Sequence, residues 1–374
     1  MAETYKISVI ICTYNRARLL EGALKSLDYQ LFNNKEYEIV VVYDGSTDDT
    51  REVVLGSELV VDVQYVPMNH AGRSAARNEG IQKSRGDYIL FVDDDILAPP
   101  ELVEAHYQAH RDHKHSVIRG PIINVTEYRI PEDRATTWRD YSSAFFCTCN
   151  ASVSRFALVD IGGFDESFVE YGFEDNELGW RLRQRGWKSR FIMDAPVFHY
   201  KPSLKREQIQ EMMVRAQELG RSAVSYYRKH PSWRVALATG LHPLLRWWNV
   251  LQSNSLLYNM CMKQWQNSSD TMGAGMRSFV ERRIFVYHYL RSLQLEASQQ
   301  PRRIAPTGGS SRAASSRDGG VTASSGETSV ERTDGPGHIG PTIGESGRIV
   351  NKNISPNVHV QSKTPPGKGS GSAF

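Results

Sequence analysis

The sequence lacks the features that define several large classes of protein. Its four cysteines, at positions 12, 147, 149 and 261, are too few and too irregularly spaced for a disulfide framework. No stretch reaches ~18 uninterrupted apolar residues and no apolar secretion segment follows the first residues, which argues against a transmembrane helix and a signal peptide. We therefore expect a cytoplasmic protein with reduced thiols. Cys147 and Cys149 have no second Cys or His pair at zinc spacing, so we expect them to alternate along a strand.

The sequence also lacks a strong excess of charge of one sign. The formal net charge is +3, and residues 301–374 hold nine Lys and Arg against five Asp and Glu, so residues 1–300 carry about −1. A nucleic-acid-binding domain needs clustered positive charge, which excludes this class for the first 300 residues. Apolar residues make up 40% of the 374 residues, enough for part of the chain to bury a core.

Three regions differ in composition. Residues 301–374 contain 13 glycines, 12 serines and seven prolines but no leucine, tryptophan, tyrosine or cysteine, so they cannot bury enough apolar surface to offset their conformational entropy. After residue 201 apolar side chains recur at helical spacing. We expect a catalytic domain at 1–203, a helical C-terminal extension at 204–298 and a disordered tail at 299–374.

Strand and helix signals alternate through the first 120 residues. The expected strands span residues 6–12, 37–43, 61–66 and 86–92, and the expected helices span residues 17–27 and 71–84. Further strands are expected at 144–150, 189–193 and 197–200, and a helix at 174–185. The fold class is therefore α/β, with a Rossmann-like mixed sheet flanked by helices. In such sheets ligands bind at the carboxyl ends of the strands.

The strongest local feature is an acidic triplet, Asp93, Asp94 and Asp95, at the end of an apolar strand. Three adjacent carboxylates repel one another, so we expect a compensating cation. Mg²⁺ and Mn²⁺ take oxygen ligands, often one or two carboxylates together with substrate phosphates. Asp93 and Asp95 form a D-x-D pair whose spacing lets both carboxylates share one metal and the sugar of a metal-bound diphosphate.

Two further polar clusters are each open to two interpretations. Asp44 follows the second strand and precedes a glycine turn. In one interpretation its carboxylate binds a nucleobase or ribose. In the other, the cluster begins a helix that Ser46 or Thr47 caps. Glu174 and Asp175 begin a helix. They either stabilise the helix start electrostatically, or the helix dipole keeps the Asp ionised so that it can act as a general base. His199, on a short apolar strand, is either a core histidine or a third metal ligand. No dinucleotide-binding glycine motif and no P-loop is present.

Five motifs, in this order, resemble the family 2 glycosyltransferases of the GT-A fold, and the resemblance covers about residues 7–199. They are Ser8-Val9-Ile10-Ile11-Cys12-Thr13-Tyr14-Asn15-Arg16, Asp44-Gly45-Ser46-Thr47-Asp48, Arg73-Ser74-Ala75-Ala76-Arg77-Asn78, Asp93-Asp94-Asp95, and Gly163-Phe164-Asp165-Glu166 leading to Glu174-Asp175. The chain departs from the pattern at Tyr43, where the family usually has a first acidic residue.

The resemblance implies a role for each site residue. It implies that the nucleotide-sugar donor is bound by Thr13, Tyr14, Asn15, Asp44, Arg73, Asp93 and Asp94. Within this set, Thr13 and Tyr14 would lie against the base, and Asp44 would bind its uracil-like edge. The metal, Mn²⁺ or Mg²⁺, would be held by Asp95, His199 and Asp93. Asp175 would be the catalytic base, and Glu174 would contact the acceptor.

We therefore expect an inverting glycosyltransferase that moves a sugar from a nucleotide diphosphate, UDP by this resemblance, to a hydroxyl of a sugar, glycoconjugate or natural product, as in polysaccharide biosynthesis. A single displacement inverts the anomeric centre, and no residue stands out as the nucleophile of a double displacement. Two alternatives remain: a polyprenol-phosphate sugar transferase, and an inactive nucleotide- or carbohydrate-binding module. A sugar-1-phosphate nucleotidyltransferase would need a glycine-rich loop after the first strand, where this chain has none.

Acceptor choice is expected to lie in residues 120–144, residues 162–171 and the helices after residue 201. Trp138 and Tyr141 can stack on a sugar ring or pack in the core. Residues 235–251 are apolar and include Trp247 and Trp248. They can form an interfacial membrane helix, which would allow peripheral membrane association, or pack against the catalytic domain, which is the interpretation we favour.

Overall fold

A seven-stranded sheet organises the first half of the chain in the computed structural model, which describes residues 5–132, 136–137, 140–269 and 271–299. Residues 300–374 of the tail predicted at 299–374, and Trp138, lie outside the described residues. The strands, in sheet order, are β3 (Asp62–Met68), β2 (Tyr37–Asp44), β1 (Ile7–Thr13), β4 (Tyr88–Asp93), β8 (Asn150–Ser154), β6 (Ser116–Arg119) and β9 (Lys188–Phe191).

The centre of this sheet is parallel and its far side is mixed. β1 pairs in parallel with both β2 and β4, and β2 pairs in parallel with β3. β8 runs antiparallel to β4 and to β6. The β-branched runs of β1 and β2 are buried almost throughout, as expected for parallel strands covered on both faces. The predicted Rossmann-like mixed sheet is confirmed.

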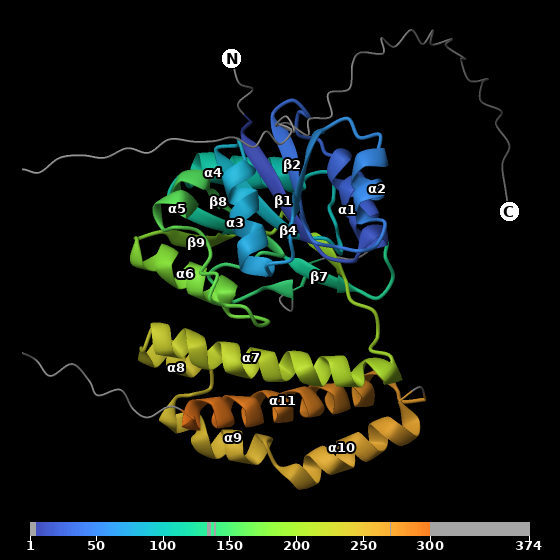
Figure 1. Cartoon of the computed structure of the whole chain (residues 1–374), viewed down its shortest axis with the longest axis vertical. Helices are drawn as coiled ribbons and strands as arrows, with labels where there is room; N and C mark the ends of the chain where they lie inside the picture. Colours follow the sequence, from blue (N-terminus) through green and yellow to red (C-terminus); the bar gives the residue numbers. More distant parts are fainter. Residues whose placement is uncertain (1–4, 133–135, 138–139, 270, 300–374) are drawn as a thin grey trace, which may run out of the picture.

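Helices cover both faces of the sheet (Figure 1). Successive side chains of β1 alternate between the two cores: Ile7, Val9 and Ile11 face one, and Ile10 faces the other. The first core packs against α1 (Ala17–Asp28), α2 (Thr50–Gly56) and α4 (Leu102–Asp112). The second packs against α3 (Arg73–Lys83), α5 (Arg155–Asp160) and α6 (Glu174–Gln184).

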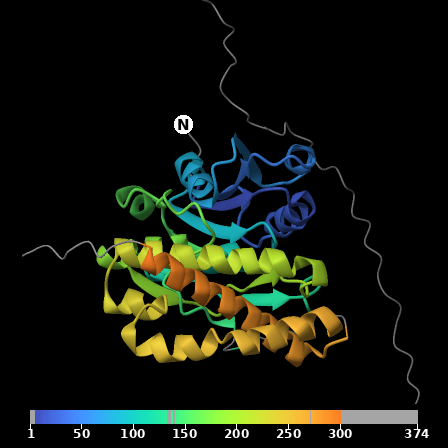
Figure 2. The same ribbon diagram turned by 60° about the horizontal axis from the view of Figure 1, so that its bottom comes forward.

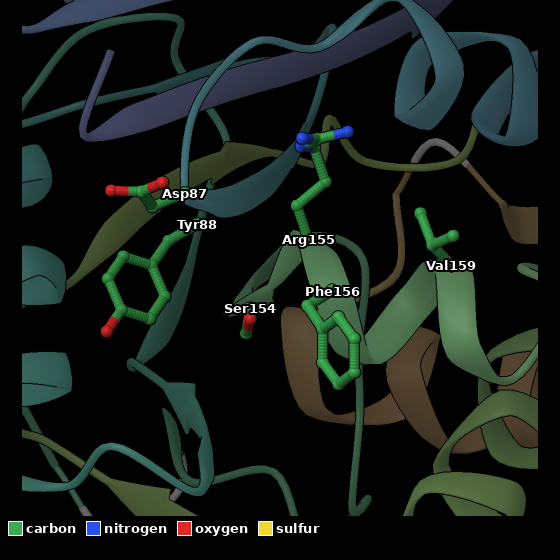
Figure 3. Close-up of a pocket in the computed structure, with 6 residues that line it drawn as sticks. All are labelled: Asp87, Tyr88, Ser154, Arg155, Phe156 and Val159. Atoms are coloured by element: carbon green, nitrogen blue, oxygen red, sulfur yellow. The ribbon is translucent and has the colours of Figure 1, made fainter. Parts of the chain in front are cut away.

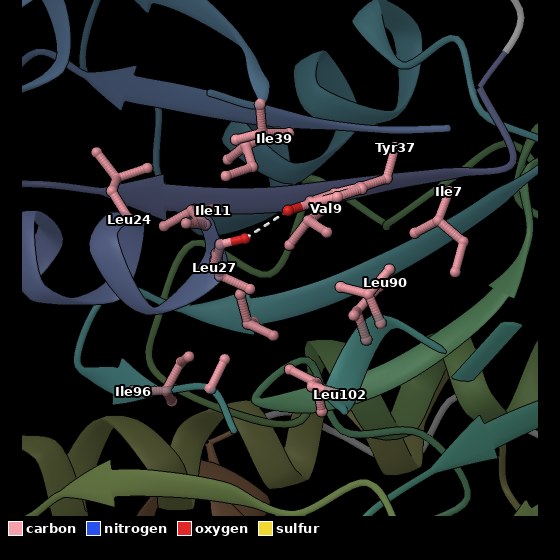
Figure 4. Close-up of a cluster of buried hydrophobic side chains, with 14 of the residues drawn as sticks. Ile7, Val9, Ile11, Leu24, Leu27, Tyr37, Ile39, Leu90, Ile96 and Leu102 are labelled. Carbon is pink, nitrogen blue, oxygen red and sulfur yellow. Dashed lines mark hydrogen bonds between the residues drawn. The ribbon is translucent and has the colours of Figure 1, made fainter. Parts of the chain in front are cut away.

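Figure 4 shows the first of these cores, in which the aliphatic side chains of β1 and α1 interdigitate. Its one labelled polar group is satisfied, because the hydroxyl of Tyr37 donates to the carbonyl oxygen of Leu27 at 2.8 Å. This bond ties β2 to the last turn of α1. The packing holds the carboxyl ends of the central strands in fixed positions, and these ends carry the polar clusters.

One predicted strand is wrong. Residues 144–149 form bends and a turn, and β8 begins only at Asn150. The amide of Asn150 donates to the carbonyl oxygen of Cys147, which closes the turn. Phe146 is nonetheless fully buried, and it packs edge-on against Phe91 and Phe164. The apolar pattern that predicted a strand therefore reflects a buried turn, and Cys147 and Cys149 do not alternate along a strand.

A three-stranded sheet lies beside the end of β4. It consists of β5 (Ile96–Leu97), β10 (Val197–Tyr200) and β7 (Ile122–Val125), with β10 in the centre. β5 follows the acidic triplet directly, and its Ile96 is paired with His199. The ladder therefore brings His199 next to the triplet.

The residues after β10 are helical, as predicted. They form η2 (Arg206–Gln208), α7 (Ile209–Lys229), α8 (Trp233–Ala238), η3 (Pro243–Leu245), α9 (Arg246–Gln252), α10 (Ser255–Ser268) and α11 (Ala274–Ser298). α7 and α11 lie side by side below the sheet, and α9 and α10 lie farther from it (Figures 1 and 2). None of the helices in the described part of the chain has the length and apolarity needed to cross a bilayer.

Candidate active site

Register brings the polar clusters to one edge of the sheet. Thr13 is paired with Tyr43, and Cys12 is paired with Asp93, so β1, β2 and β4 end at the same level. The residues that follow these strands therefore surround a common site at their carboxyl ends. This is the edge at which ligands bind in open α/β sheets.

A cation from the chain itself lies within the acidic triplet. One guanidinium nitrogen of Arg16, Nη1, donates to Oδ1 of Asp94 at 2.9 Å and to Oδ2 of Asp95 at 2.6 Å. The hydroxyl of Thr13 donates to the other oxygen of Asp94 at 2.9 Å. Burial raises the pKa of Asp94 to about 6, although Arg16 opposes the shift. Asp94 is thus fully partnered within the protein, and Asp93 and Asp95 face the site.

One oxygen of Asp95 has no hydrogen-bond partner although it is buried. This oxygen, Oδ1, lies 3.4 Å from Nε2 of His199. The other ring nitrogen of His199 is 2.9 Å from the amide oxygen of Asn124, so it carries the proton and leaves the lone pair of Nε2 directed toward Asp95. A buried carboxylate oxygen beside an oriented imidazole nitrogen fits a divalent cation.

A third ligand group adjoins this pair. Ligand atoms of Asp93, Cys149 and His199 all lie within 4.8 Å of one another. Burial, together with the charge of Asp93, raises the pKa of the Cys149 thiol well above its ordinary value, and Mn²⁺ and Mg²⁺ prefer oxygen ligands to a thiol. The residues that fit Mn²⁺ or Mg²⁺ are therefore the two carboxylates and the histidine.

A second part of the site surrounds Asp44. Its carboxylate accepts hydrogen bonds from the backbone amides of Ala71 and Gly72 at 2.8 and 3.2 Å. His70 lies 3.0 Å from the same carboxylate, and its ring stacks on that of Tyr14 with the centroids 4.5 Å apart. Tyr14 is 46% exposed, so the stacked rings form an aromatic surface at the site edge.

The loops after β1 and β2 hold each other in place. Asn15 has a φ of 55°, and its side-chain oxygen accepts from the amide of Thr47 at 2.7 Å. Its own amide donates to the hydroxyl of Ser46 at 2.8 Å. The prediction that Ser46 or Thr47 caps a helix is therefore wrong, because α2 begins at Thr50 and the carboxylate of Asp48 accepts from the Thr50 amide. Tyr43 bonds within this loop, since its hydroxyl donates to the carbonyl oxygen of Ser46.

Arg73 lies at the first position of α3. Its exposed guanidinium stacks over the ring of Tyr171, with Cζ 4.8 Å from the ring centroid. Tyr171 belongs to the loop that leads into α6. Arg73 therefore links the start of α3 to the loop that we expect to shape the acceptor side.

The acidic pair Glu174 and Asp175 begins α6, as predicted. Phe173, immediately before it, has a φ of 65°, an uncommon conformation for an aromatic residue that tends to occur at functional sites. One oxygen of Asp175 accepts from the amide and the hydroxyl of Thr148 at 3.0 and 3.1 Å. The other oxygen, Oδ1, is buried without a hydrogen-bond partner. Asp175 thus has one oxygen held in place and one available.

A buried arginine joins the acidic pair. Nη1 of Arg77 donates to Glu174 at 2.8 Å and lies 3.6 Å from Oδ1 of Asp175, and Nη2 donates to the hydroxyl of Thr148 at 2.8 Å. Burial raises the pKa of Asp175 to about 6. Arg77 opposes this shift, while the charges of Glu174 and Asp93 reinforce it.

Comparison with known proteins points to one enzyme family for this part of the chain. The sequence profile described as "Glycosyl transferase family 2" matches residues 8–162, and a profile described as "N-terminal domain of galactosyltransferase" matches residues 134–203. Residues 8–162 thus match the family 2 glycosyltransferases. The two profiles together cover every strand and loop of the site just described.

Relatives and a solved structure agree with this family. The chain is 32% identical over 219 residues to a validoxylamine A glucosyltransferase of Streptomyces hygroscopicus subsp. jinggangensis, a match covering 48% of this chain and 52% of that one. It is 24% identical to a chondroitin synthase of Escherichia coli, covering 60% of this chain and 39% of that one. The chain thus spans only about half, or less, of the length of these relatives.

The fold is also that of the family. A mannosyltransferase of Pyrobaculum calidifontis, solved with GDP-Man and Mn²⁺, superposes with a TM-score of 0.55 at 16% identity, over 78% of this chain and 88% of that one. At this identity the likeness concerns the fold alone, and it confirms the predicted GT-A type.

Several residues of this site have no role in the prediction from sequence. Arg77 and Asn78 belong to the third motif, in which the resemblance assigns a role only to Arg73. Asn78 holds the Gly163 turn, where its side-chain oxygen accepts from the Phe164 amide at 2.7 Å. Gly163 has a φ of 67°, and a Cβ there would lie 2.4 Å from Asn78. A functional role for Arg77 could have been inferred from its helical spacing of four residues from Arg73, because both face one side of α3.

His70, Arg16 and Cys149 were missed for other reasons. His70 lies in a loop, and nothing near it in the sequence shows that it stacks on Tyr14. Arg16 was included in the first motif without a role. Cys149 was assigned to a strand, and its approach to Asp93 depends on the turn before β8. These contacts join residues far apart in the sequence, which local patterns do not report.

A separate hollow lies away from this glycosyltransferase site. Its volume is about 350 Å³, and Figure 3 shows the residues that line it: Asp87, Tyr88, Ser154, Arg155, Phe156 and Val159. Tyr88 begins β4, whereas Asp93 ends it. The hollow is therefore at the opposite ends of the strands from the site described above.

Proposed function

We propose that the protein is an inverting glycosyltransferase that transfers a sugar from a nucleotide diphosphate donor, UDP-linked, to a hydroxyl acceptor. The observation that carries the proposal is the pairing of two carboxylate groups with different surroundings. Oδ1 of Asp95 lies beside His199 and accepts no hydrogen bond. Oδ1 of Asp175 also accepts none, and the pKa of this carboxyl group is raised to about 6. The first suits a metal ion, and the second suits a general base.

The donor would bind across the ends of β1, β2 and β4. The stacked rings of Tyr14 and His70 provide an aromatic surface for a nucleobase. Thr13, Asn15 and Asp44 surround this surface, and their hydrogen bonds fix the loops against which the base and ribose would rest. Arg73 is an exposed cation at the edge of this region, which suits the charge of a diphosphate donor.

Asp95, His199 and Asp93 would hold Mn²⁺ or Mg²⁺. When bound, the ion offsets the negative charge that develops on the departing diphosphate. Asn124 keeps the proton of His199 on Nδ1, so Nε2 stays free to coordinate. The mannosyltransferase that shares this fold was solved with GDP-Man and Mn²⁺, which supports a metal ion as part of donor binding.

Asp175 would take the proton of the acceptor hydroxyl. Its Oδ2 is fixed by Thr148, so Oδ1 is the oxygen that accepts the proton. As the O–H bond breaks, the acceptor oxygen bonds to the anomeric carbon and the bond from that carbon to the diphosphate breaks. One displacement inverts the configuration. The positive charge of Arg77 keeps Asp175 ionised near neutral pH, and Glu174 would contact the acceptor.

The acceptor class is a sugar, glycoconjugate or natural-product hydroxyl. The relatives named after validoxylamine A and chondroitin support both a small-molecule and a polysaccharide acceptor. Because the chain spans only part of these relatives, the acceptor has to be found by assay.

The test is release of the nucleotide diphosphate from a panel of UDP- and GDP-sugars with and without Mn²⁺. Asp175→Asn should lower kcat by about 10²- to 10⁴-fold, the usual contribution of a general base. The matched control is Asp160→Asn, which removes a surface carboxylate paired with Arg185 and should leave kcat unchanged.

Two results would contradict the proposal. The first is turnover by Asp175→Asn within a few-fold of the unmodified protein. The second is a product whose NMR spectrum shows that the donor's anomeric configuration is kept. Nucleotide binding without release from any donor would instead favour the binding-module alternative.

A further inference from the structure

An apolar surface covers the side of the helical part that faces away from the sheet. We define this outer face by the exposed side chains of η3, α9 and α10. They are Leu244, Trp247, Trp248, Val250, Leu251, Leu256 and Met260. Trp247 is 83% exposed and Leu256 is 70% exposed. Figures 1 and 2 show that α9 and α10 lie beyond α7 and α11, so the catalytic sheet does not cover them.

The outer face is on the opposite side of α10 from the residues that pack in the core of the helical part. α10 buries Cys261 and Trp265 against Ile209, Met213 and Ile284. Its opposite side carries Leu256, Met260 and Lys263, which are spaced at four and three residues and so form one stripe. The favoured interpretation, in which residues 235–251 pack against the catalytic domain, therefore holds only for the start of this segment. Val235 is buried against Phe168 and Tyr226, whereas Trp247 and Trp248 are exposed.

The charges of this region have one sign. From Trp233 to Ser268 the sequence contains Arg234, Arg246 and Lys263 but no Asp or Glu. The whole chain has 42 acidic residues among 374, so a stretch of 36 residues would hold about four at the average rate. The apolar side chains of this region favour an apolar partner surface. Its positive charges, with no carboxylate among them, favour a partner surface that is also anionic.

We propose that the outer face docks on an anionic lipid bilayer. Tryptophan side chains favour the region between lipid headgroups and acyl chains, and lysine and arginine are attracted to acidic headgroups. The described helices cannot span a bilayer, so the association is with its surface. This inference concerns a different face from the donor site and does not depend on the proposed reaction.

Two other occupants fit less well. A second copy of the chain would bring Lys263 of one outer face toward Lys263 of another, and residues 233–268 contain no carboxylate to pair with it. Residues 301–374 carry nine Lys and Arg against five Asp and Glu and have no leucine, tryptophan or tyrosine. Their charge has the same sign as the outer face and would instead add to attraction toward acidic lipid.

The test is cosedimentation of the full chain with two kinds of vesicle, phosphatidylcholine alone and an equal mixture of phosphatidylcholine and phosphatidylglycerol. We expect binding to the mixed vesicles, weaker binding at high salt, and a blue shift of tryptophan fluorescence on binding. Replacing both Trp247 and Trp248 with serine should lower the vesicle affinity about tenfold or more. Lys263→Glu should weaken binding to the mixed vesicles, which are anionic, and should leave any binding to pure phosphatidylcholine vesicles unchanged.

A matched control replaces two exposed apolar residues elsewhere. Tyr29 and Leu31, at 78% and 70% exposure, follow α1 in the sheet domain, and the double serine variant should bind vesicles as the unmodified chain does. Far-UV circular dichroism and the melting temperature show that each variant is folded. Absence of binding to mixed vesicles would overturn the proposal, as would unchanged binding by the double tryptophan variant. A dimer in solution that this variant converts to monomer would assign the face to a second copy instead.

Discussion

The ring of Phe173 stacks on the ring of Tyr226, with centroids 5.8 Å apart and planes 26° from parallel. Phe173 is the residue in a left-handed conformation immediately before the acidic pair, and Tyr226 is a buried residue of α7. Ser222, one turn earlier on α7, donates to the carbonyl oxygen of Gly172. The helical extension therefore holds the backbone from which Asp175 projects.

This contact predicts that a residue outside the sheet domain controls turnover. Tyr226→Ala removes the ring against which Phe173 is held, so the start of α6 can relax. We expect kcat to fall about tenfold to a hundredfold, because misplacing a catalytic group by about 1 Å has effects of this size. Tyr226→Phe keeps the ring and should restore kcat. Steady-state kinetics distinguishes the two, and equal loss in both variants would show that the stacking is not what matters.

The pH dependence of the reaction should depend on Arg77. A protonated Asp175 cannot accept a proton, and its pKa is raised to about 6, so kcat/KM should fall as the pH drops below about 6. Arg77 lowers this pKa by favouring the carboxylate, so its loss raises the pKa. In Arg77→Gln the acidic limb should move to higher pH by about one unit or more.

The control for this shift keeps the charge. Arg77→Lys retains a cation near Asp175 while losing the second hydrogen bond to Thr148, and its acidic limb should stay closer to that of the unmodified protein. The comparison uses the position of the limb and not its height, so partial loss of stability does not obscure it. An unmoved limb in Arg77→Gln would show that another group is being titrated.

Metal affinity should depend on Asn124, which contacts His199 and is not among the expected ligands. Asn124→Ala removes the acceptor that keeps the imidazole proton on Nδ1. We expect about tenfold to a hundredfold weaker Mn²⁺ binding, the usual effect of removing such a partner. Electron paramagnetic resonance of free Mn²⁺ measures this directly. His113→Gln, at an exposed position after α4, is the control and should bind Mn²⁺ unchanged.

The alternation of β-branched runs with amphipathic stretches was sufficient to predict the central sheet. Each of the first four strands lies within two residues of its expected bounds, because strands buried on both faces leave a clear apolar run. The helix at Glu174 was also predicted, since acidic residues at a helix start and a glycine after its end are local signals. The turn at residues 144–149 was not, because a buried turn and a buried strand have the same apolar content.

The sequence was sufficient to predict most residues of the candidate site but not the hydrogen bonds between them. The residues at the strand ends could be named because parallel strands place their carboxyl ends together. The partner of Asp94 could not, since Arg16 reaches it across 78 positions of sequence. The expectation of a cation beside the triplet was therefore met in part by the chain itself.

The two halves of the site owe their rigidity to different sources. Strand pairing joins His199 to Ile96 of β5, the residue that follows Asp95. This pairing therefore sets the distance between the His199 imidazole and the Asp95 carboxylate. The start of α6 is instead held by side-chain contacts: Phe173 stacks on Tyr226 of α7, and Thr148 donates to Asp175. Parts of one structure can open separately, each with its own free energy. A local opening at α6 would therefore displace the proposed base while the proposed metal ligands stay in place.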